Sequence, residues 1–207
     1  MKHPPERSGS IFRSFGLADL ITLANASCGM GAIFLCLKHV TGSDTPYLWC
    51  IFVLLPLSLV CDVLDGLTAR RLTGHSALGG DLDSLADIVS FGVAPAALGF
   101  TLGLRGFWDA LVLIYFVVCG ISRLARFNVT AETLADQTGK VKYYEGIPIP
   151  SSILIVAILG ISYWQGHVDN LILFGSCPVG PWVFHPFTIL YAVSGSAMIS
   201  TIRIPKP

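Results

Sequence analysis

Charge is what this 207-residue chain has least of: only 13% of its residues are charged, while 53% are hydrophobic. A soluble domain of this length would carry about twice that charged fraction, so the composition argues against a soluble fold. The net charge is zero at pH 7, which indicates no nucleic-acid partner. The six cysteines form no C-x-x-C pair and have no histidine at ligand spacing. We therefore interpret them as small apolar packing residues.

The chain contains long hydrophobic runs. A helix needs about 20 apolar residues to cross a bilayer, and six segments of the chain are long enough. These predicted spans are residues 17–39, 46–72, 78–102, 107–127, 148–164 and 186–203. The sequence therefore predicts an all-α polytopic membrane protein with six transmembrane helices. Residues 166–185 are broken by Pro178, Gly180 and Pro181, and we expect an outer loop there that dips into the membrane interface.

The basic residues predict how the chain is oriented. With the N-terminus in the cytoplasm, only Lys38 and Arg105 of the 13 basic residues fall on the outer side. This excess of inner basic residues follows the positive-inside rule. An even number of spans places the C-terminus in the cytoplasm as well. We expect a cytoplasmic segment at residues 1–16 and a single transmembrane domain at residues 17–205, in the cytoplasmic (inner) membrane.

Carboxylates are concentrated in one stretch, CDVLDGLTARRLTGHSALGGDLDSLAD, at residues 61–87. Asp62 and Asp65 are three apart and Asp83 and Asp87 are four apart, so each pair lies on one helix face. Both pairs fall near the cytoplasmic ends of adjacent predicted helices and can face each other. Four clustered carboxylates repel one another, and a divalent cation would relieve that repulsion. Oxygen ligands suit Mg²⁺, Mn²⁺ or Ca²⁺, and two metals sharing four carboxylates commonly serve phosphate chemistry.

Two other interpretations of this cluster are open. The acids could pair with Arg70 and Arg71 in a structural network, although intramembrane charges are usually functional. They could also form the ion pathway of a cation transporter. A transporter does not explain why Gly66, Ala69 and Arg70 stand at fixed positions between the acids. Asp81 would be a residue of the helix start, where acids are favoured.

From Asp62 to Asp87 the stretch reads D-x2-D-G-x2-A-R-x8-G-x3-D-x3-D, which resembles the full signature of the CDP-alcohol phosphotransferases. The resemblance implies a transferase with a divalent cofactor, two Mg²⁺ or Mn²⁺ ions, and a homodimer. The implied metal ligands are Asp62, Asp65, Asp83 and Asp87. The implied CDP-binding residues are Asp62, Gly66, Ala69, Arg70 and Gly79. Asp87 would also act as the general base on the incoming alcohol.

Four more stretches resemble the phosphatidylserine synthase branch of that family. They are TLANASCG at 22–29, DSLADIVSFGVAPA at 83–96, SRLARFNV at 122–129 and GIPIPSS at 146–152. This resemblance implies that CDP-diacylglycerol and L-serine are the substrates, and that phosphatidylserine and CMP are the products. Other acceptors (glycerol 3-phosphate, inositol phosphate, choline) and a donor with archaeal ether-linked chains are the alternatives.

A serine acceptor brings a carboxylate to the site, and the fourth predicted helix offers cations for it. Arg123 and Arg126 are three apart near the end of that helix and can project to similar sides. One of them could bind the carboxylate in a bidentate pair, with Asn128 as a further ligand. Both arginines could instead be anchors for anionic headgroups. Asn25 in the first span could hold the nucleotide or form a bond between helices.

Overall fold

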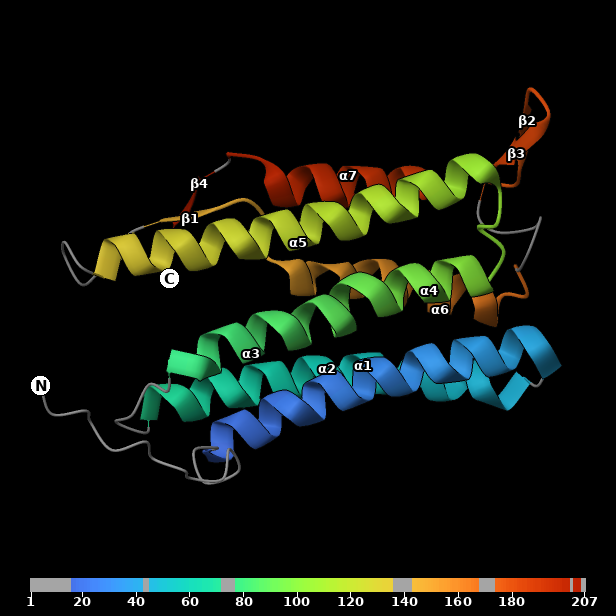
Figure 1. Ribbon diagram of the computed structural model, residues 1–207. Helices are drawn as coiled ribbons and strands as arrows, with labels where there is room; N and C mark the ends of the chain where they lie inside the picture. The colour runs from blue at the N-terminus through green and yellow to red at the C-terminus, as the bar shows by residue number, and fades with distance from the viewer. Residues whose placement is uncertain are drawn as a thin grey trace, which may run out of the picture.

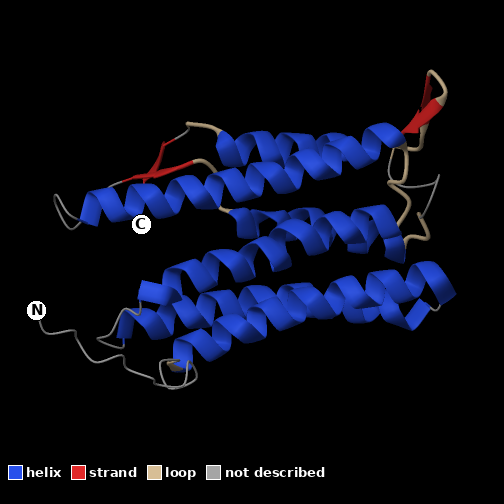
Figure 2. Cartoon of the chain, viewed as in Figure 1, coloured by secondary structure: helices blue, strands red, loops and turns tan. Residues whose placement is uncertain are grey.

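The computed structural model describes residues 16–42, 45–71, 77–135, 143–167, 174–201 and 203–205, and most of these residues are helical (Figure 2). The α-helices are α1 (Leu17–Gly42), α2 (Thr45–Arg71), α3 (Ala77–Asp87), α4 (Ala94–Thr101), α5 (Phe107–Ala135), α6 (Ile153–Trp164) and α7 (Thr188–Ile199). A π-helical segment, η2 (Ile88–Val93), joins α3 to α4, and a 3₁₀ turn, η3 (Ile149–Ser152), leads into α6.

The long helices run side by side in one bundle (Figure 1). Helix α1 packs on α2 and on the continuous segment α3–η2–α4, while α5 packs mainly on α7. The segment α3–η2–α4 thus separates the α1–α2 pair from the α5–α7 pair, and α6 packs on both α2 and α4. The start of α1, the start of α3 and strand β4 (Arg203–Pro205) all lie at the same end of the bundle.

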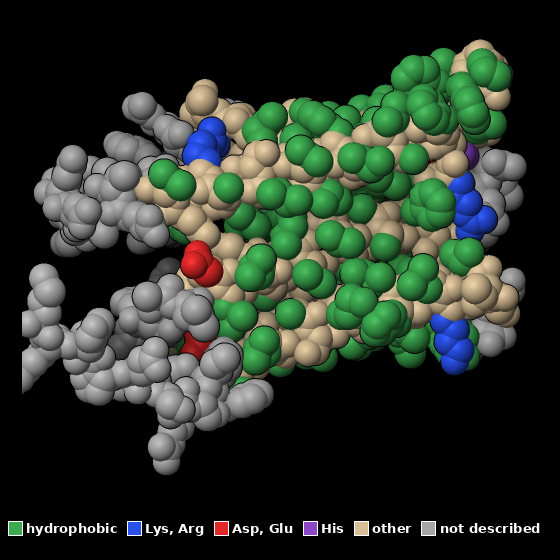
Figure 3. Space-filling view, viewed as in Figure 1, with side chains coloured by type: hydrophobic (Ala, Val, Ile, Leu, Met, Phe, Trp, Pro, Cys, Tyr) green, Lys and Arg blue, Asp and Glu red, His purple; other side chains and the backbone are tan. Residues whose placement is uncertain are grey.

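Within the described ranges, four helical segments are long and apolar enough to cross a membrane: Leu17–Gly42, Tyr47–Thr68, Gly79–Thr101 and Phe107–Val129. On the face drawn in Figure 3, the charged side chains lie at the two ends and hydrophobic side chains occupy much of the band between them. These features support the prediction of an integral membrane protein. The other two predicted spans are apolar but shorter helices, Ile149–Trp164 and Thr188–Ile199. At about 1.5 Å per residue, the 12 residues of α7 reach only roughly 18 Å of the about 30 Å hydrocarbon core.

The third predicted span is helical throughout but changes its winding in the middle. Proline has no backbone N–H, so Pro95 cannot donate the α-helical hydrogen bond to the Phe91 carbonyl, and its ring would crowd that carbonyl. The chain widens into the six residues of η2 directly before this point, and the Ala94 N–H donates to the Val89 oxygen, five residues back. The wider turn accommodates the proline without breaking the span. It also begins directly after Asp87.

The described residues also form two small antiparallel sheets, and the mostly helical chain is consistent with the predicted all-α class. Their strands are β1 (Tyr143–Glu145) with β4, and β2 (Cys177–Val179) with β3 (Trp182–Phe184). Each strand has only three residues, which is too short for an alternating pattern to be visible in the sequence. The hairpin β2–β3 lies within the expected outer loop. Helix α5 also continues to Ala135, beyond residue 127, where the fourth predicted span ends.

A buried network of hydrogen bonds around Asp109 stabilises the end of the bundle opposite the start of α3. The carboxylate of Asp109, which is fully buried, accepts hydrogen bonds from the backbone N–H groups of Gly106 and His185, both at 2.9 Å. The Thr188 hydroxyl also donates to it at 2.9 Å, and the His185 ring lies 2.5 Å from its second oxygen. These bonds join the start of α5 to the start of α7. They stabilise that end without any residue of the aspartate cluster.

Candidate metal and transferase site

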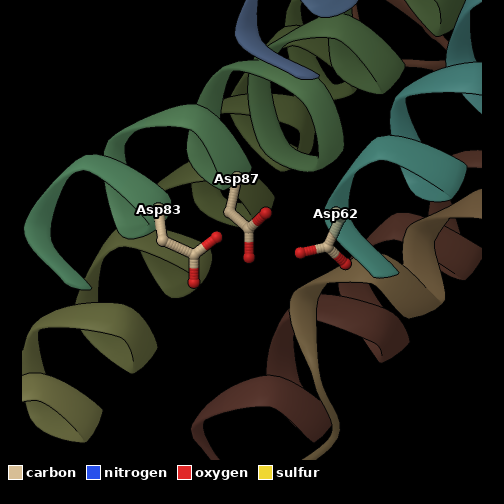
Figure 4. A group of neighbouring side chains, drawn as sticks. All are labelled: Asp62, Asp83 and Asp87. Atoms are coloured by element: carbon tan, nitrogen blue, oxygen red, sulfur yellow. The ribbon is translucent and has the colours of Figure 1, made fainter. Parts of the chain in front are cut away.

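Three of the four predicted carboxylates converge from two helices. Asp62 projects from α2, and Asp83 and Asp87 project one turn apart from α3, with their carboxylates directed toward one another (Figure 4). One oxygen from each of the three lies within 4.8 Å of the others. The i, i+4 spacing on α3 therefore presents both of its acids to the same point on α2, as the sequence predicts.

The surroundings of these acids make the cluster costly without a counter-charge. Asp87 is only 7% exposed, and Asp62 and Asp83 are half-buried. One oxygen of Asp83 is buried without a hydrogen-bond partner among the described residues. Carboxylates this close and this dry require a proton or a cation between them. A set of three carboxylates with an unsatisfied oxygen fits an oxygen-preferring divalent ion such as Mg²⁺ or Mn²⁺.

The fourth predicted carboxylate, Asp65, lies outside this group of three. It is 5% exposed on α2, and its Oδ2 accepts a 2.7 Å hydrogen bond from the Thr22 hydroxyl of α1. Its charge still acts on Asp62, Asp83 and Asp87. Asp65 therefore borders the group of three, with one oxygen bonded to α1.

The small residues of the signature lie on the same two helices. Gly66 is exposed, and a Cβ added to it would meet no atom of the described part of the chain within 4 Å. Gly79 lies in the first turn of α3 and is half-buried. Ala69 and Arg70 belong to α2, but their side chains lie outside the described part of the structure. The open face at Gly66 leaves room for a molecule to approach the α2 backbone, in line with the expectation for a glycine at this position.

The three candidate acceptor residues of α5 have different surroundings. Arg123 is half-buried and interacts electrostatically with Asp87, and its Nε is buried with no hydrogen-bond partner among the described residues. Arg126 donates to the backbone oxygen of Ser200, just past the end of α7, at 3.3 Å. The Asn128 amide faces α3, where it accepts from the Ser84 hydroxyl at 3.1 Å and reaches Asp81 at 3.5 Å. Arg123 thus interacts with the aspartate cluster through its charge.

Helix α1 contributes polar side chains that the sequence interpretation largely missed. Asn25 donates to Asp87 at 3.4 Å, and the Ser90 hydroxyl of η2 donates to the Asn25 backbone oxygen at 2.9 Å. Thr22, Asn25 and Gly29 follow one another at i, i+3 and i+7, and all three are buried. This spacing was the available signal, because a polar residue repeating on the buried face of an apolar helix indicates a partner on a neighbouring helix.

The family model for CDP-alcohol phosphatidyltransferases matches residues 15–183, which include every element of this site. The chain belongs to this family. Membership accounts for the signature from Asp62 to Asp87 and for the apolar helices that carry it, and it agrees with the resemblance drawn from the sequence.

Relatives within the family share a narrower name. A protein of Saccharomyces cerevisiae named CDP-diacylglycerol–serine O-phosphatidyltransferase is 39% identical over 98% of this chain and 75% of its own length. A protein of the same name from Methanocaldococcus jannaschii is 33% identical over 95% of this chain and 77% of its own length. An archaetidylserine synthase of Methanothermobacter thermautotrophicus is 38% identical over 68% of this chain and 56% of its own length.

Proposed function

We propose that this family member is a phosphatidylserine synthase, which transfers the phosphatidyl group of CDP-diacylglycerol to the hydroxyl of L-serine and releases CMP. The observation that carries the proposal is the convergence of Asp62, Asp83 and Asp87 at one end of an apolar bundle. The names of relatives that match nearly the whole chain support serine as the acceptor. A site at the end of the helices suits a reaction between a lipid in the bilayer and two water-soluble molecules.

In the proposed reaction, Asp87 takes the proton of the serine hydroxyl. The serine oxygen then attacks the phosphorus that carries the diacylglycerol. The bond from this phosphorus to the oxygen it shares with the second phosphate breaks, and CMP leaves with that oxygen. Gly66 and Gly79, with Ala69 and Arg70, would form the cradle for the CDP group. The open surface at Gly66 supports this assignment.

Divalent ions, Mg²⁺ or Mn²⁺ and two in number, are the proposed cofactor. Asp62, Asp65, Asp83 and Asp87 would hold them, since their carboxylates supply only oxygen ligands. When bound, such ions neutralise the diphosphate and stabilise charge on the departing phosphate. Within the chain, the role of the cluster is to fix the ligands at the ends of two packed helices.

For the acceptor we propose Arg123 as the ligand of the serine carboxylate. It lies near Asp87 and its buried Nε has no partner among the described residues. A guanidinium matches a carboxylate in a bidentate pair. Arg126, which donates to Ser200, and Asn128, which bonds to α3, would instead hold Arg123 and α3 in place.

We also propose the topology and assembly predicted from the sequence. Residues 17–205 would form one domain with six spans, in which η3–α6 and α7 complete the count. The segment 1–16 and both termini would lie in the cytoplasm, and the site would face the cytoplasm from the inner membrane. The basic residues support this orientation. A homodimer follows from the family resemblance, and light scattering of the protein in detergent would test it.

The experiment is CMP release by the purified protein with CDP-diacylglycerol and Mn²⁺ or Mg²⁺. Serine, glycerol 3-phosphate, inositol phosphate and choline are supplied separately, and Asp87→Asn is the control. We expect release with serine alone, none after chelation of the metal, and none from the variant. Release with another acceptor would contradict the serine assignment. A second donor with ether-linked isoprenoid chains is included because one relative is an archaetidylserine synthase. Preference for that donor would change the lipid and keep the reaction.

A further inference from the structure

A short hydrogen bond ties Asp65 of the aspartate cluster to α1, a helix that carries none of the cluster's acids. The Thr22 hydroxyl of α1 donates to Asp65 Oδ2 at 2.7 Å, and both residues are buried, at 4% and 5% exposed. The same hydroxyl lies 3.1 Å from the Ala18 backbone oxygen, four residues back on its own helix. A hydroxyl has only one proton to donate. The shorter contact to a carboxylate is the stronger of the two.

The local bond alone would satisfy Thr22, as it satisfies other hydroxyls of the helix. Ser27 donates to the Leu23 oxygen at 2.7 Å on the exposed side of α1 and makes this local bond alone among those described. Threonines in helices commonly bond the carbonyl four residues back. The hydroxyl of Thr22 is therefore not needed to stabilise α1 itself. Its particular contribution is to hold one oxygen of Asp65.

The position of Thr22 is fixed by contacts further along α1. Ser90 of η2 donates to the Asn25 backbone oxygen at 2.9 Å. Gly29 lies so close to the Ser90 backbone that a Cβ at that position would be 2.7 Å from Ser90 Cα. Helix α1 is thus anchored to the segment that directly follows Asp87. Thr22 is consequently held at a set distance from the acids of both α2 and α3.

We propose that Thr22 is a positioning residue that orients Asp65 for metal binding. Its hydroxyl fixes Oδ2, so the other oxygen of the carboxylate is left to complete the site formed by Asp62, Asp83 and Asp87. Partners that orient a ligand in this way commonly contribute 10- to 100-fold to metal affinity. The inference rests on the proposed function, because it assumes that the aspartate cluster holds a divalent ion.

The test is Mn²⁺ binding to the purified full chain in detergent, without substrates, followed by electron paramagnetic resonance of free Mn²⁺. Thr22→Val keeps the branched shape and removes the hydroxyl, while Thr22→Ser keeps the hydroxyl. Ser27→Ala is the matched control, because it removes an α1 hydroxyl with a local bond alone among those described. We expect the Mn²⁺ dissociation constant to rise about 10-fold in Thr22→Val. It should stay near the wild-type value in Thr22→Ser and Ser27→Ala.

The outcomes separate this inference from the function on which it rests. Wild-type protein that binds no Mn²⁺ would contradict the metal site itself. Wild-type binding with an unchanged or lower dissociation constant in folded Thr22→Val would overturn the role of Thr22 alone. If Thr22→Val fails to fold, Thr22→Ala removes the same hydroxyl with no added bulk and carries the same expectation. Thermal melting of each variant shows whether a loss of affinity comes from unfolding.

Discussion

Gly29→Ala would perturb the site through the contact between α1 and η2. A Cβ at Gly29 would lie 2.5 Å from the Ser90 hydroxyl oxygen and 2.7 Å from Ser90 Cα. Carbon atoms in contact are normally about 3.5–4.0 Å apart, so the two helical segments must separate by roughly 1 Å. A rotation of the Ser90 side chain would not relieve the contact, because one of the two atoms belongs to the backbone. Alanine at position 29 must therefore move α1, η2 or both.

Gly29→Ala is expected to lower both the stability of the protein and its catalytic rate. Overfilling a packed interface typically costs about 1–3 kcal/mol, and the hydrogen bond from Ser90 to the Asn25 backbone oxygen would be stretched. The catalytic loss arises because Asp87 stands three residues before Ser90 and Thr22 stands two turns before Gly29. A displacement of about 1 Å among groups that position a reaction can cost on the order of 100-fold in rate. We expect kcat for serine-dependent CMP release to fall by about that factor.

Gly31→Ala on the same helix is the matched control. A Cβ there would lie 3.6 Å from Leu54 Cδ1, an ordinary contact. Alanine is favoured over glycine inside a helix by about 0.5–1 kcal/mol, so Gly31→Ala should melt at or above the wild-type temperature with unchanged kcat. The assays are CMP release at saturating substrates and thermal melting in detergent. Equal kcat and melting temperature in the two variants would refute the proposed close approach of α1 to η2.

Two further predictions concern the substrates. Arg123→Gln should raise the KM for serine about 10-fold or more, since a hydrogen bond between charged groups contributes about 1.5–3 kcal/mol. Arg126→Gln should lower the melting temperature and leave that KM near its wild-type value; the opposite pattern, measured by CMP release, would assign the carboxylate to Arg126. Gly66→Ala should raise the KM for CDP-diacylglycerol without loss of stability, because its Cβ meets no atom of the described residues within 4 Å. Gly80→Ala, which is equally open, should change neither quantity, and equal KM values in these two variants would count against a nucleotide cradle at Gly66.

The sequence predicts the parts of this fold that depend on local composition. Apolar runs locate the helices, because a helix in a bilayer satisfies its own backbone groups and needs only apolar side chains. The spacing of Asp83 and Asp87 predicts one acidic face, since i and i+4 lie one above the other. With Asp62 and Asp65 on the adjacent helix, it predicts four carboxylates that face one another, and the structure brings Asp62, Asp83 and Asp87 together.

Features that depend on contacts between distant segments were not predicted. The bond from Thr22 to Asp65 joins residues 43 positions apart, and the sequence shows only a polar residue in an apolar helix. The π-helical segment depends on Pro95. This proline lies in a span whose pattern otherwise predicts one continuous helix. Asn128 was grouped with the arginines by its position at the end of one helix, whereas its amide bonds to α3.

The buried acids at the two ends of the bundle have different roles, one in stability and the other in chemistry. At one end, Asp109 receives hydrogen bonds from Gly106, His185 and Thr188 and is fully buried, so its charge is satisfied within the chain. At the other end, the carboxylates of α2 and α3 face one another with an unsatisfied oxygen on Asp83. A buried acid that is already satisfied has no capacity for a ligand, whereas acids that repel one another gain stability when a cation or a proton comes between them. This contrast within one chain is the physical argument for a functional role of the Asp62–Asp87 cluster, independent of the relatives' names.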